Sequence, residues 1–183
     1  ATASDTPKAY LNVVLKNASN DTAAKESVTI TTTIGTVGDG SSVRGRSVVL
    51  KYNSTSAAFP IYSDGTAGTG TITVSTPSVT FATKSVTFYA AAPATLVASV
   101  ATPNLRVGTN ADSVRVTAKD VNGVNWAGTV YIYASAAADA VIAGAVRATA
   151  AADATSCTWL AAYNFHSCAI TGTAGGTAKF KVS

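Results

Sequence analysis

The feature that most constrains the fold is the alternation of apolar and polar side chains in residues 114–135. Val114, Val116 and Ala118 alternate with polar residues, the period-two pattern of a strand with one buried face. Turn-forming Asp, Asn and Gly follow, and a second alternating run begins at Val130. Two such strands joined by a loop cannot bury their apolar faces alone, so the pattern predicts a second sheet packed over them.

The composition favours an all-β fold. Hydrophobic residues make up 47% of the 183 residues and charged residues only 12%, so polarity comes mainly from Thr, Ser and Asn. Val and Thr are strand formers, whereas the usual helix builders Glu, Lys and Leu are scarce. The length suits two domains of about 90 residues, near the size of immunoglobulin-like modules. We therefore expect two tandem immunoglobulin-like β-sandwich domains.

Domain boundaries follow from changes in pattern. Residues 1–9 are polar and irregular, and we expect a linker or leader there. The first sandwich is expected over 10–90 and the second over 91–183, joined by a proline-stiffened AAPA link. Pro60 predicts that its strand lies at a sheet edge, because proline lacks a backbone N–H. Within the Ala-rich stretch 138–155 we favour strand plus loop over helix, while 44–46 and 53–58 are predicted as loops.

The two predicted domains show a weak internal repeat at an offset of about 103 positions. The aligned apolar positions are Leu11, Val13 and Leu15 with Val114, Val116 and Ala118, then Val28 and Ile30 with Val130 and Ile132. Ile72 and Val74 in the first domain match the AKFKV that ends the second. Two copies of one sandwich explain this order most simply.

Three stretches carry a resemblance to a known family: 93–98 (PATLVA), 114–123 (VRVTAKDVNG) and 126–128 (WAG). They resemble bacterial immunoglobulin-like domains of the invasin and intimin type, in which a V-x-D-x-N-G-x-P-x-x-G-x-x-V run joins two strands. The chain departs from that run at Asn125-Trp126, where the family usually has proline. The resemblance implies an extracellular stalk or array at the cell surface, as in adhesins, surface-layer proteins and some phage virion decorations.

The two cysteines, Cys157 and Cys168, are eleven positions apart with aromatic residues between them. An even number of cysteines in a chain rich in Ser and Thr favours an oxidising, exported setting and a disulfide. Two free thiols, or a metal site that also uses His166, are the alternatives. A zinc site needs four ligands, or three and a water, and this stretch offers three at poor spacing.

No motif in the sequence assembles a catalytic site, so we expect no enzyme and no catalytic residues. His166 is the single histidine, no G-x-S-x-G elbow is present, and we predict a loop histidine. The nine acidic residues are spread thinly and mostly fall in turns. Asp120 and Asn122 are a weak calcium candidate, with Asp5, Asp21 or Asp112 as further ligands, and no other cofactor is expected.

Three aromatic residues between the cysteines, together with one tryptophan earlier in the chain, predict a contact patch that is exposed on the surface. Its members are Trp126, Trp159, Tyr163 and Phe165. Packing within the chain or assembly with other subunits is favoured over ligand binding, because aromatic residues dominate interface cores.

Charge and hydropathy exclude two classes of partner. The net charge is +4, but Lys and Arg are scattered, whereas a nucleic-acid binder concentrates them on one face. The sequence contains no run of 18 apolar residues, so it predicts no membrane-spanning helix. The chain contains no Met, so we expect an excised or mature piece of a longer protein.

The predicted function is that of a structural segment of an exported bacterial surface protein, a surface-layer or adhesin stalk. Such a segment would space subunits and associate laterally with copies of itself or with neighbouring domains. The alternative is an adhesin or phage decoration module that binds carbohydrate or a receptor through the aromatic loop between Cys157 and Cys168.

Overall fold

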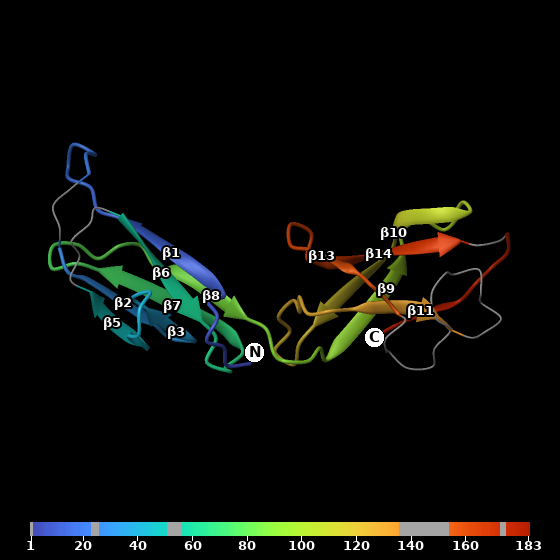
Figure 1. The fold of residues 1–183 in the computed structure, drawn as a ribbon, viewed down its shortest axis with the longest axis horizontal. Coiled ribbons are helices and arrows are strands. Elements are labelled where there is room, and N and C mark those ends of the chain that lie inside the picture. The colour runs from blue at the N-terminus through green and yellow to red at the C-terminus, as the bar shows by residue number, and fades with distance from the viewer. Residues whose placement is uncertain (1, 23–25, 51–55, 136–153, 173–174) are drawn as a thin grey trace. The chain divides into compact units, whose positions relative to one another are not determined.

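A computed structural model describes residues 2–22, 26–50, 56–135, 154–172 and 175–183. The chain divides into two compact units, Ala1–Ala90 and Ala91–Ser183 (Figure 1). The regular secondary structure of the described residues is entirely β-strand. Accordingly, the described parts of the chain include no helix long and apolar enough to cross a membrane.

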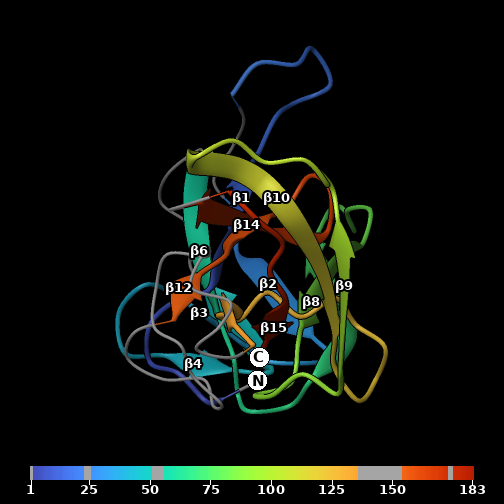
Figure 2. The same ribbon diagram turned by 90° about the vertical axis from the view of Figure 1, so that its right-hand side faces the viewer.

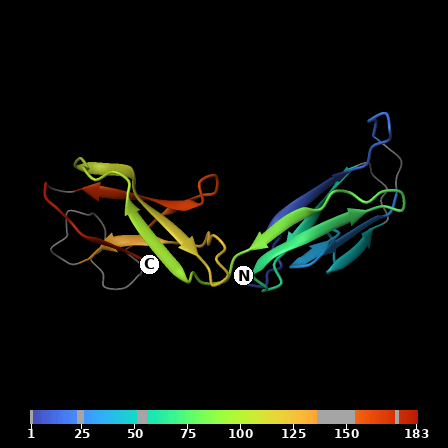
Figure 3. The same cartoon turned by 180° about the vertical axis from the view of Figure 1, so that it is seen from behind.

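The first unit is a sandwich of two antiparallel sheets. Its strands are β1 (Ala9–Val14), β2 (Val28–Thr32), β3 (Thr36–Gly38), β4 (Arg44–Gly45), β5 (Ser47–Leu50), β6 (Ser56–Tyr62), β7 (Gly68–Ser75) and β8 (Lys84–Phe88). They form sheets of order β1-β6-β3-β4 and β5-β2-β7-β8, which lie as two layers in Figures 1 and 3. Val13, Phe59 and Ile61 from one sheet share a single core with Ile30 and Ile72 from the other. The alternating residues of each strand therefore meet between the layers.

The second unit is also a two-layered sandwich. Its strands are β9 (Thr95–Val100), β10 (Gly108–Lys119), β11 (Tyr131–Ala134), β12 (Thr155–Ser156), β13 (Thr158–Leu160), β14 (Phe165–Gly172) and β15 (Phe180–Val182). They form sheets of order β13-β14-β10-β9 and β12-β11-β15. Val114 and Val116 of β10 share the core with Ile132 of β11 and Cys168 of β14. The all-β fold of two tandem immunoglobulin-like sandwiches is thus as predicted.

Strand β10 carries the longest run of alternation but does not pair with β11, the next strand in the chain. The two strands lie in different sheets, and β10 pairs with β9 and β14 instead. Figure 2 shows β10 curving over the second unit with β9 beside it. The turn at residues 120–123 therefore begins a connection between the two sheets rather than a hairpin.

The prediction that Pro60 lies in an edge strand is wrong, because β6 lies between β1 and β3. The ladder between β6 and β3 pairs Ile61 with Val37 and Tyr62 with Thr36, and it ends before Pro60. No residue of β3 pairs with Pro60, so the missing N–H of the proline removes no hydrogen bond from the ladder between β6 and β3.

Several predicted boundaries also differ from the structure. The predicted linker 1–9 is bonded to the first unit, since the amides of Ser4 and Lys8 donate to the carbonyls of Ser63 and Ile61. Arg44 and Gly45, predicted as loop, form β4, and residues 56–58 belong to β6. Most of the Ala-rich stretch, 136–153, lies outside the described residues, as do 51–55.

Candidate functional site

Strand β14 organises the most distinctive part of the second unit, because its side chains alternate between the core and the surface. His166, Cys168 and Ile170 are buried, whereas Phe165 and Ser167 are half-buried on the opposite face. A strand places successive side chains on opposite faces. The aromatic stretch of the sequence is thus divided between an inner and an outer surface.

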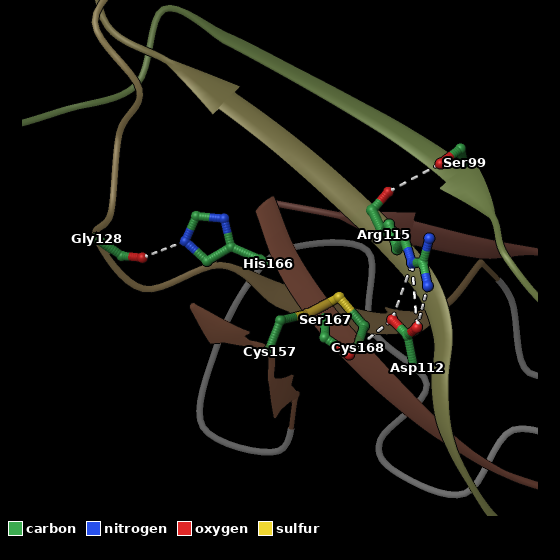
Figure 4. The surroundings of a disulfide bond; sticks show 8 residues. All are labelled: Ser99, Asp112, Arg115, Gly128, Cys157, His166, Ser167 and Cys168. Atoms are coloured by element: carbon green, nitrogen blue, oxygen red, sulfur yellow. Dashed lines mark hydrogen bonds and ion pairs between the residues drawn. A yellow bond between two sulfur atoms is a disulfide. The ribbon is translucent and has the colours of Figure 1, made fainter. Parts of the chain in front are cut away.

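On the inner face, Cys157 and Cys168 form a disulfide with an S–S distance of 2.01 Å (Figure 4). Cys157 lies between β12 and β13, and its amide donates to the carbonyl of Val130 at 2.8 Å. The segment predicted as a cysteine loop is a β-hairpin, because β13 pairs with β14. The disulfide therefore fastens the chain before β13 to the middle of β14.

His166 is fully buried in β14, so the prediction of a loop histidine is wrong. Its ring lies 4.8 Å from the ring of Trp159, and Nε2 lies 2.9 Å from the carbonyl oxygen of Gly128 (Figure 4). A carbonyl only accepts, so Nε2 carries the proton and donates this bond. Within the described residues Nδ1 has no hydrogen-bond partner. These contacts give the imidazole a packing role in the core.

On the outer face, a β-bulge in β10 turns the carboxylate of Asp112 toward β14. The pairing of β10 with β14 shifts between Asn110 and Val114, and Asp112 has a positive φ of 51°. Aspartate tolerates this left-handed conformation better than most residues. The Oγ of Ser167 donates to Oδ1 of Asp112 at 2.9 Å. The bulge thereby lets the Asp112 side chain link β10 to β14, because it breaks the regular alternation of side chains along β10.

Arg115 completes this cluster and connects it to aromatic rings. Its guanidinium donates to both carboxylate oxygens of Asp112 and lies 4.9 Å above the ring of Phe165 (Figure 4 shows the ion pair). The ring of Phe165 stacks on that of Tyr163, with centroids 5.7 Å apart. Tyr163 is in the turn between β13 and β14 and is 70% exposed. We call Asp112, Arg115, Tyr163, Phe165 and Ser167 the outer-face patch.

The charges of the outer-face patch reinforce one another. Hydrogen bonds from Arg115, and then from Ser167, hold the pKa of the Asp112 carboxyl below its ordinary value of 3.8. The hydrogen bond to Asp112 in turn raises the pKa of Arg115. The carboxylate and the guanidinium are therefore both charged at neutral pH. Their ion pair holds the guanidinium over the Phe165 ring.

The structure separates the four aromatic residues of the predicted contact patch. Trp126 is only 8% exposed and lies in the core, so its assignment to an exposed patch is wrong. Trp159 is half-buried against His166, whereas Tyr163 and Phe165 lie together on the outer face. Trp126 follows a turn that returns it to the core, because its amide donates to the carbonyl of Ala118.

The sequence did not reveal the cluster of Asp112, Arg115 and Ser167. Residues three apart on a regular strand point to opposite faces, so only the bulge brings Asp112 and Arg115 together. Ser113 and Val114 are consecutive and both buried, which marks the break in alternation. Asp112 lies two residues before Val114, where the alternation begins. The sequence does not show which residue between Asn110 and Val114 a bulge turns out of the regular strand.

Asp120, the carboxylate of the predicted calcium site, accepts local backbone hydrogen bonds. Asp120 is buried, and its Oδ1 accepts the amides of Asn122 and Val124 at 2.8 and 2.9 Å. This is the turn-capping role of aspartate. No group of three or more His, Cys, Asp or Glu side chains is positioned for a metal ion within the ranges that the structure describes. Calcium binding by Asp120 and Asn122 stays a prediction.

Comparisons with known proteins add little to this geometry. No protein-family model matches the chain, and no curated protein matches it. A solved structure titled "Crystal structure of invasin: a bacterial integrin-binding protein" is similar to the chain at 17% identity and a TM-score of 0.37. That alignment covers 99% of this chain but only 32% of invasin, so the chain spans about a third of that protein. Membership in the bacterial immunoglobulin-like family therefore stays a prediction.

Proposed function

We propose that this chain is a non-enzymatic segment of an exported bacterial surface protein, a surface-layer or adhesin stalk. Its two sandwiches space the subunits, and the outer-face patch makes a lateral contact with a neighbouring subunit. The observation that carries the proposal is the stack of exposed Tyr163 on half-buried Phe165, with Arg115 over the Phe165 ring, on the outer face of the sheet β13-β14-β10-β9.

Two properties make this surface suitable for a protein contact. Tyr and Arg are enriched at interfaces, because a large ring or a planar guanidinium buries much area with few polar atoms left unpaired. The patch is also held in place before it binds, since Asp112 fixes Arg115 and the disulfide fastens β14. A pre-organised surface loses less conformational freedom on association.

An exported setting is supported by the disulfide between Cys157 and Cys168. Disulfides persist in oxidising compartments and are rare in the cytosol. The low share of charged residues, 12%, also suits dense packing of subunits, because few like charges would oppose it. Extracellular location at the cell surface is therefore part of the same proposal.

Analytical ultracentrifugation of the 183-residue chain tests lateral association. We expect the sedimentation coefficient to rise with concentration, and the double variant Tyr163→Ala with Phe165→Ala to weaken association about tenfold or more. Tyr10→Ala is the matched control, because Tyr10 is 62% exposed on a strand of the first unit. A chain that stays monomeric up to about 1 mM, near the weakest specific contacts, would contradict the proposal.

Carbohydrate binding is the second candidate, and the flat ring stack of Tyr163 on Phe165 favours it. A sugar ring could pack on the exposed tyrosine while Arg115 and the Asp112 carboxylate bond its hydroxyl groups. A glycan array distinguishes the two functions. Binding that is lost in Tyr163→Ala and kept in Tyr10→Ala would favour this second function, and absence of glycan binding with concentration-dependent sedimentation would favour lateral association.

A further inference from the structure

One short motif in the second unit carries a chemistry that the proposed function does not use. Asn122 is the only asparagine in the sequence that is followed by glycine. The backbone nitrogen of the next residue can attack the side-chain carbonyl of an asparagine and close a five-membered ring. Glycine favours this attack, because it has no Cβ atom to obstruct the approach. The pair Asn122-Gly123 is therefore the place in the chain where this reaction is easiest.

The reaction needs only water. The backbone nitrogen of Gly123 forms a bond to Cγ of Asn122, and the bond from Cγ to the side-chain nitrogen breaks. That nitrogen leaves as ammonia and takes the proton of the Gly123 amide, which leaves a succinimide ring. Water then adds to either ring carbonyl and opens the ring to aspartate or isoaspartate. Both products carry one more negative charge than asparagine, and nothing is oxidised or reduced.

The reacting pair lies at the surface, where water can reach it. Asn122 and Gly123 are both exposed, and the neighbouring Val121 is 78% exposed. Apart from its chain neighbours, no heavy atom of the described residues lies within 4 Å of the position that a Cβ atom would take on Gly123. Packing around the pair therefore does not prevent the ring from forming.

The folded turn nevertheless holds the attacking nitrogen in place. The amide of Gly123 donates to the carbonyl of Asp120 at 3.0 Å. The Asp120 carboxylate is buried, and its Oδ1 accepts the amides of Asn122 and Val124 at 2.8 and 2.9 Å. The amide of Asp120 donates to the carbonyl of Val124 at 2.9 Å, which closes the turn. To reach Cγ of Asn122, the Gly123 nitrogen must leave its hydrogen bond, and the turn must open.

We propose that Asn122 is a site of spontaneous deamidation and that the hydrogen bonds of Asp120 control its rate. The closed turn withholds the Gly123 nitrogen, so the reaction proceeds from the fraction of molecules in which the turn is open. Local opening has a free energy between nearly zero and that of global unfolding. The rate at Asn122 therefore reports how often this part of the second unit opens. The turn contains no residue of the outer-face patch, so the proposal does not depend on the proposed function.

The product would weaken the turn that had slowed its formation. Isoaspartate adds a methylene group to the main chain between residues 122 and 123, so the two amides that bond Oδ1 of Asp120 no longer keep their spacing. We therefore expect the isoaspartate form to unfold at a lower urea concentration than the unmodified chain. Tryptophan fluorescence measures this, because both tryptophans lie in the second unit. Equal urea midpoints would contradict the role assigned to the Asp120 hydrogen bonds.

Peptide mapping by mass spectrometry of the full 183-residue chain, kept in mildly alkaline buffer, tests the proposal. A synthetic peptide with the sequence of residues 118–127, AKDVNGVNWA, gives the rate without the fold. We expect deamidation at Asn122 in both, about tenfold or more slower in the folded chain. Unfolding the chain in urea should bring its rate to that of the peptide. This comparison needs no variant to fold.

Asp120→Ala removes the carboxylate that holds the turn. It should raise the rate at Asn122 in the folded chain about fivefold or more, because hydrogen bonds to a charged group are lost. The same change in the peptide should have no effect, and Asp120→Asn should retain most of the slowing, because its oxygen can still accept the amides. Asp39→Ala is the matched control, because Oδ1 of Asp39 accepts the amides of Ser41 and Val43 in a turn of the same form in the first unit.

Three outcomes would overturn the proposal. Equal rates in the folded chain and the peptide would show that the turn does not withhold the Gly123 nitrogen. No product at Asn122 in the urea-unfolded chain would show that the pair is not a modification site. A rate that Asp120→Ala leaves unchanged, or that Asp39→Ala raises equally, would show that the hydrogen bonds of Asp120 do not control the reaction.

Discussion

At the scale of single residues, close contacts around Trp126 and Gly128 hold the core of the second unit. A Cβ atom on Gly128 would lie 2.1 Å from Cζ2 of Trp126, whose buried ring cannot move freely. The carbonyl of Gly128 also accepts the hydrogen bond from His166. This glycine is required by a close approach of backbone to an indole ring.

Gly128→Ala should therefore lower the free energy of unfolding of the second unit by about 1–3 kcal/mol, the usual range for overpacking. Urea denaturation followed by tryptophan fluorescence measures this directly, because both tryptophans lie in the second unit. Gly175→Ala is the control, since no heavy atom lies within 4 Å of a Cβ there. Equal stabilities of the two variants would show that the ring adapts without cost.

Asp112 gives the second unit a pH dependence. Its folded-state pKa is lowered by Arg115 and then by Ser167, so its ion pair stabilises the fold above the ordinary value of 3.8. That contribution is lost as the pH falls below 3.8 through the folded-state pKa. We expect it to be modest, because an ion pair at the surface is screened by solvent.

The urea midpoint measured by tryptophan fluorescence between about pH 5 and 2 tests this effect. Asp112→Asn should flatten the acid limb of the profile, because the amide does not titrate. Ser167→Ala should retain most of it, because Arg115 still binds the carboxylate. Profiles that run parallel for the wild type and Asp112→Asn would refute the assignment.

At the scale of elements, the hairpin of β13 and β14 depends on a covalent link. The disulfide fastens Cys157, just before β13, to Cys168 in the middle of β14, a sequence separation of 11. Closing a loop of this size restricts the unfolded chain. Cys168 lies on the same strand as Phe165, and that strand pairs with β10 on both sides of the bulge that carries Asp112.

Replacing both cysteines by alanine should lower the free energy of unfolding by about 2–4 kcal/mol, from lost cross-linking and buried volume. Chemical denaturation of the variant against the oxidised wild type measures it, and reduced wild type separates the cross-link from the packing. The hairpin amides should also exchange faster in the variant. A change below about 0.5 kcal/mol, the level of a neutral surface substitution, would contradict this role.

At the scale of the whole molecule, each unit has its own core. The buried residues from Val13 to Phe88 form one cluster and those from Val114 to Ile170 form the other. A domain with its own core unfolds as a cooperative unit. The chain therefore contains two such cores within the described residues.

We expect calorimetry to show two transitions. Ile30→Ala should lower the first unit's free energy of unfolding by about 2–5 kcal/mol, the cost of a large-to-small change in a core. The transition reported by tryptophan fluorescence should not move, because the tryptophans belong to the second unit. A shift of that transition in Ile30→Ala would show that the two units unfold together.

Much of this architecture was predictable from local pattern. The alternation of Val114, Val116 and Ala118 identified buried strand faces, because the period of a strand is set by its own backbone. The abundance of Val and Thr identified the fold class, and the cysteine pair indicated a disulfide. These properties depend on neighbours in the sequence, or on composition as a whole.

Other features depended on contacts between distant parts of the chain. From the sequence we predicted Pro60 in an edge strand, Trp126 at the surface and His166 in a loop. The structure instead has Pro60 in a central strand and buries Trp126 and His166 in the core. A side chain's exposure depends on which sheet covers it, and a strand's partners depend on pairings formed across many residues. The outer-face patch likewise exists because a bulge in β10 turned Asp112 toward β14. The alternation of side chains is set by the backbone of a single strand. Which strands pair, and which side chains a second sheet covers, is decided only when the whole sandwich has folded.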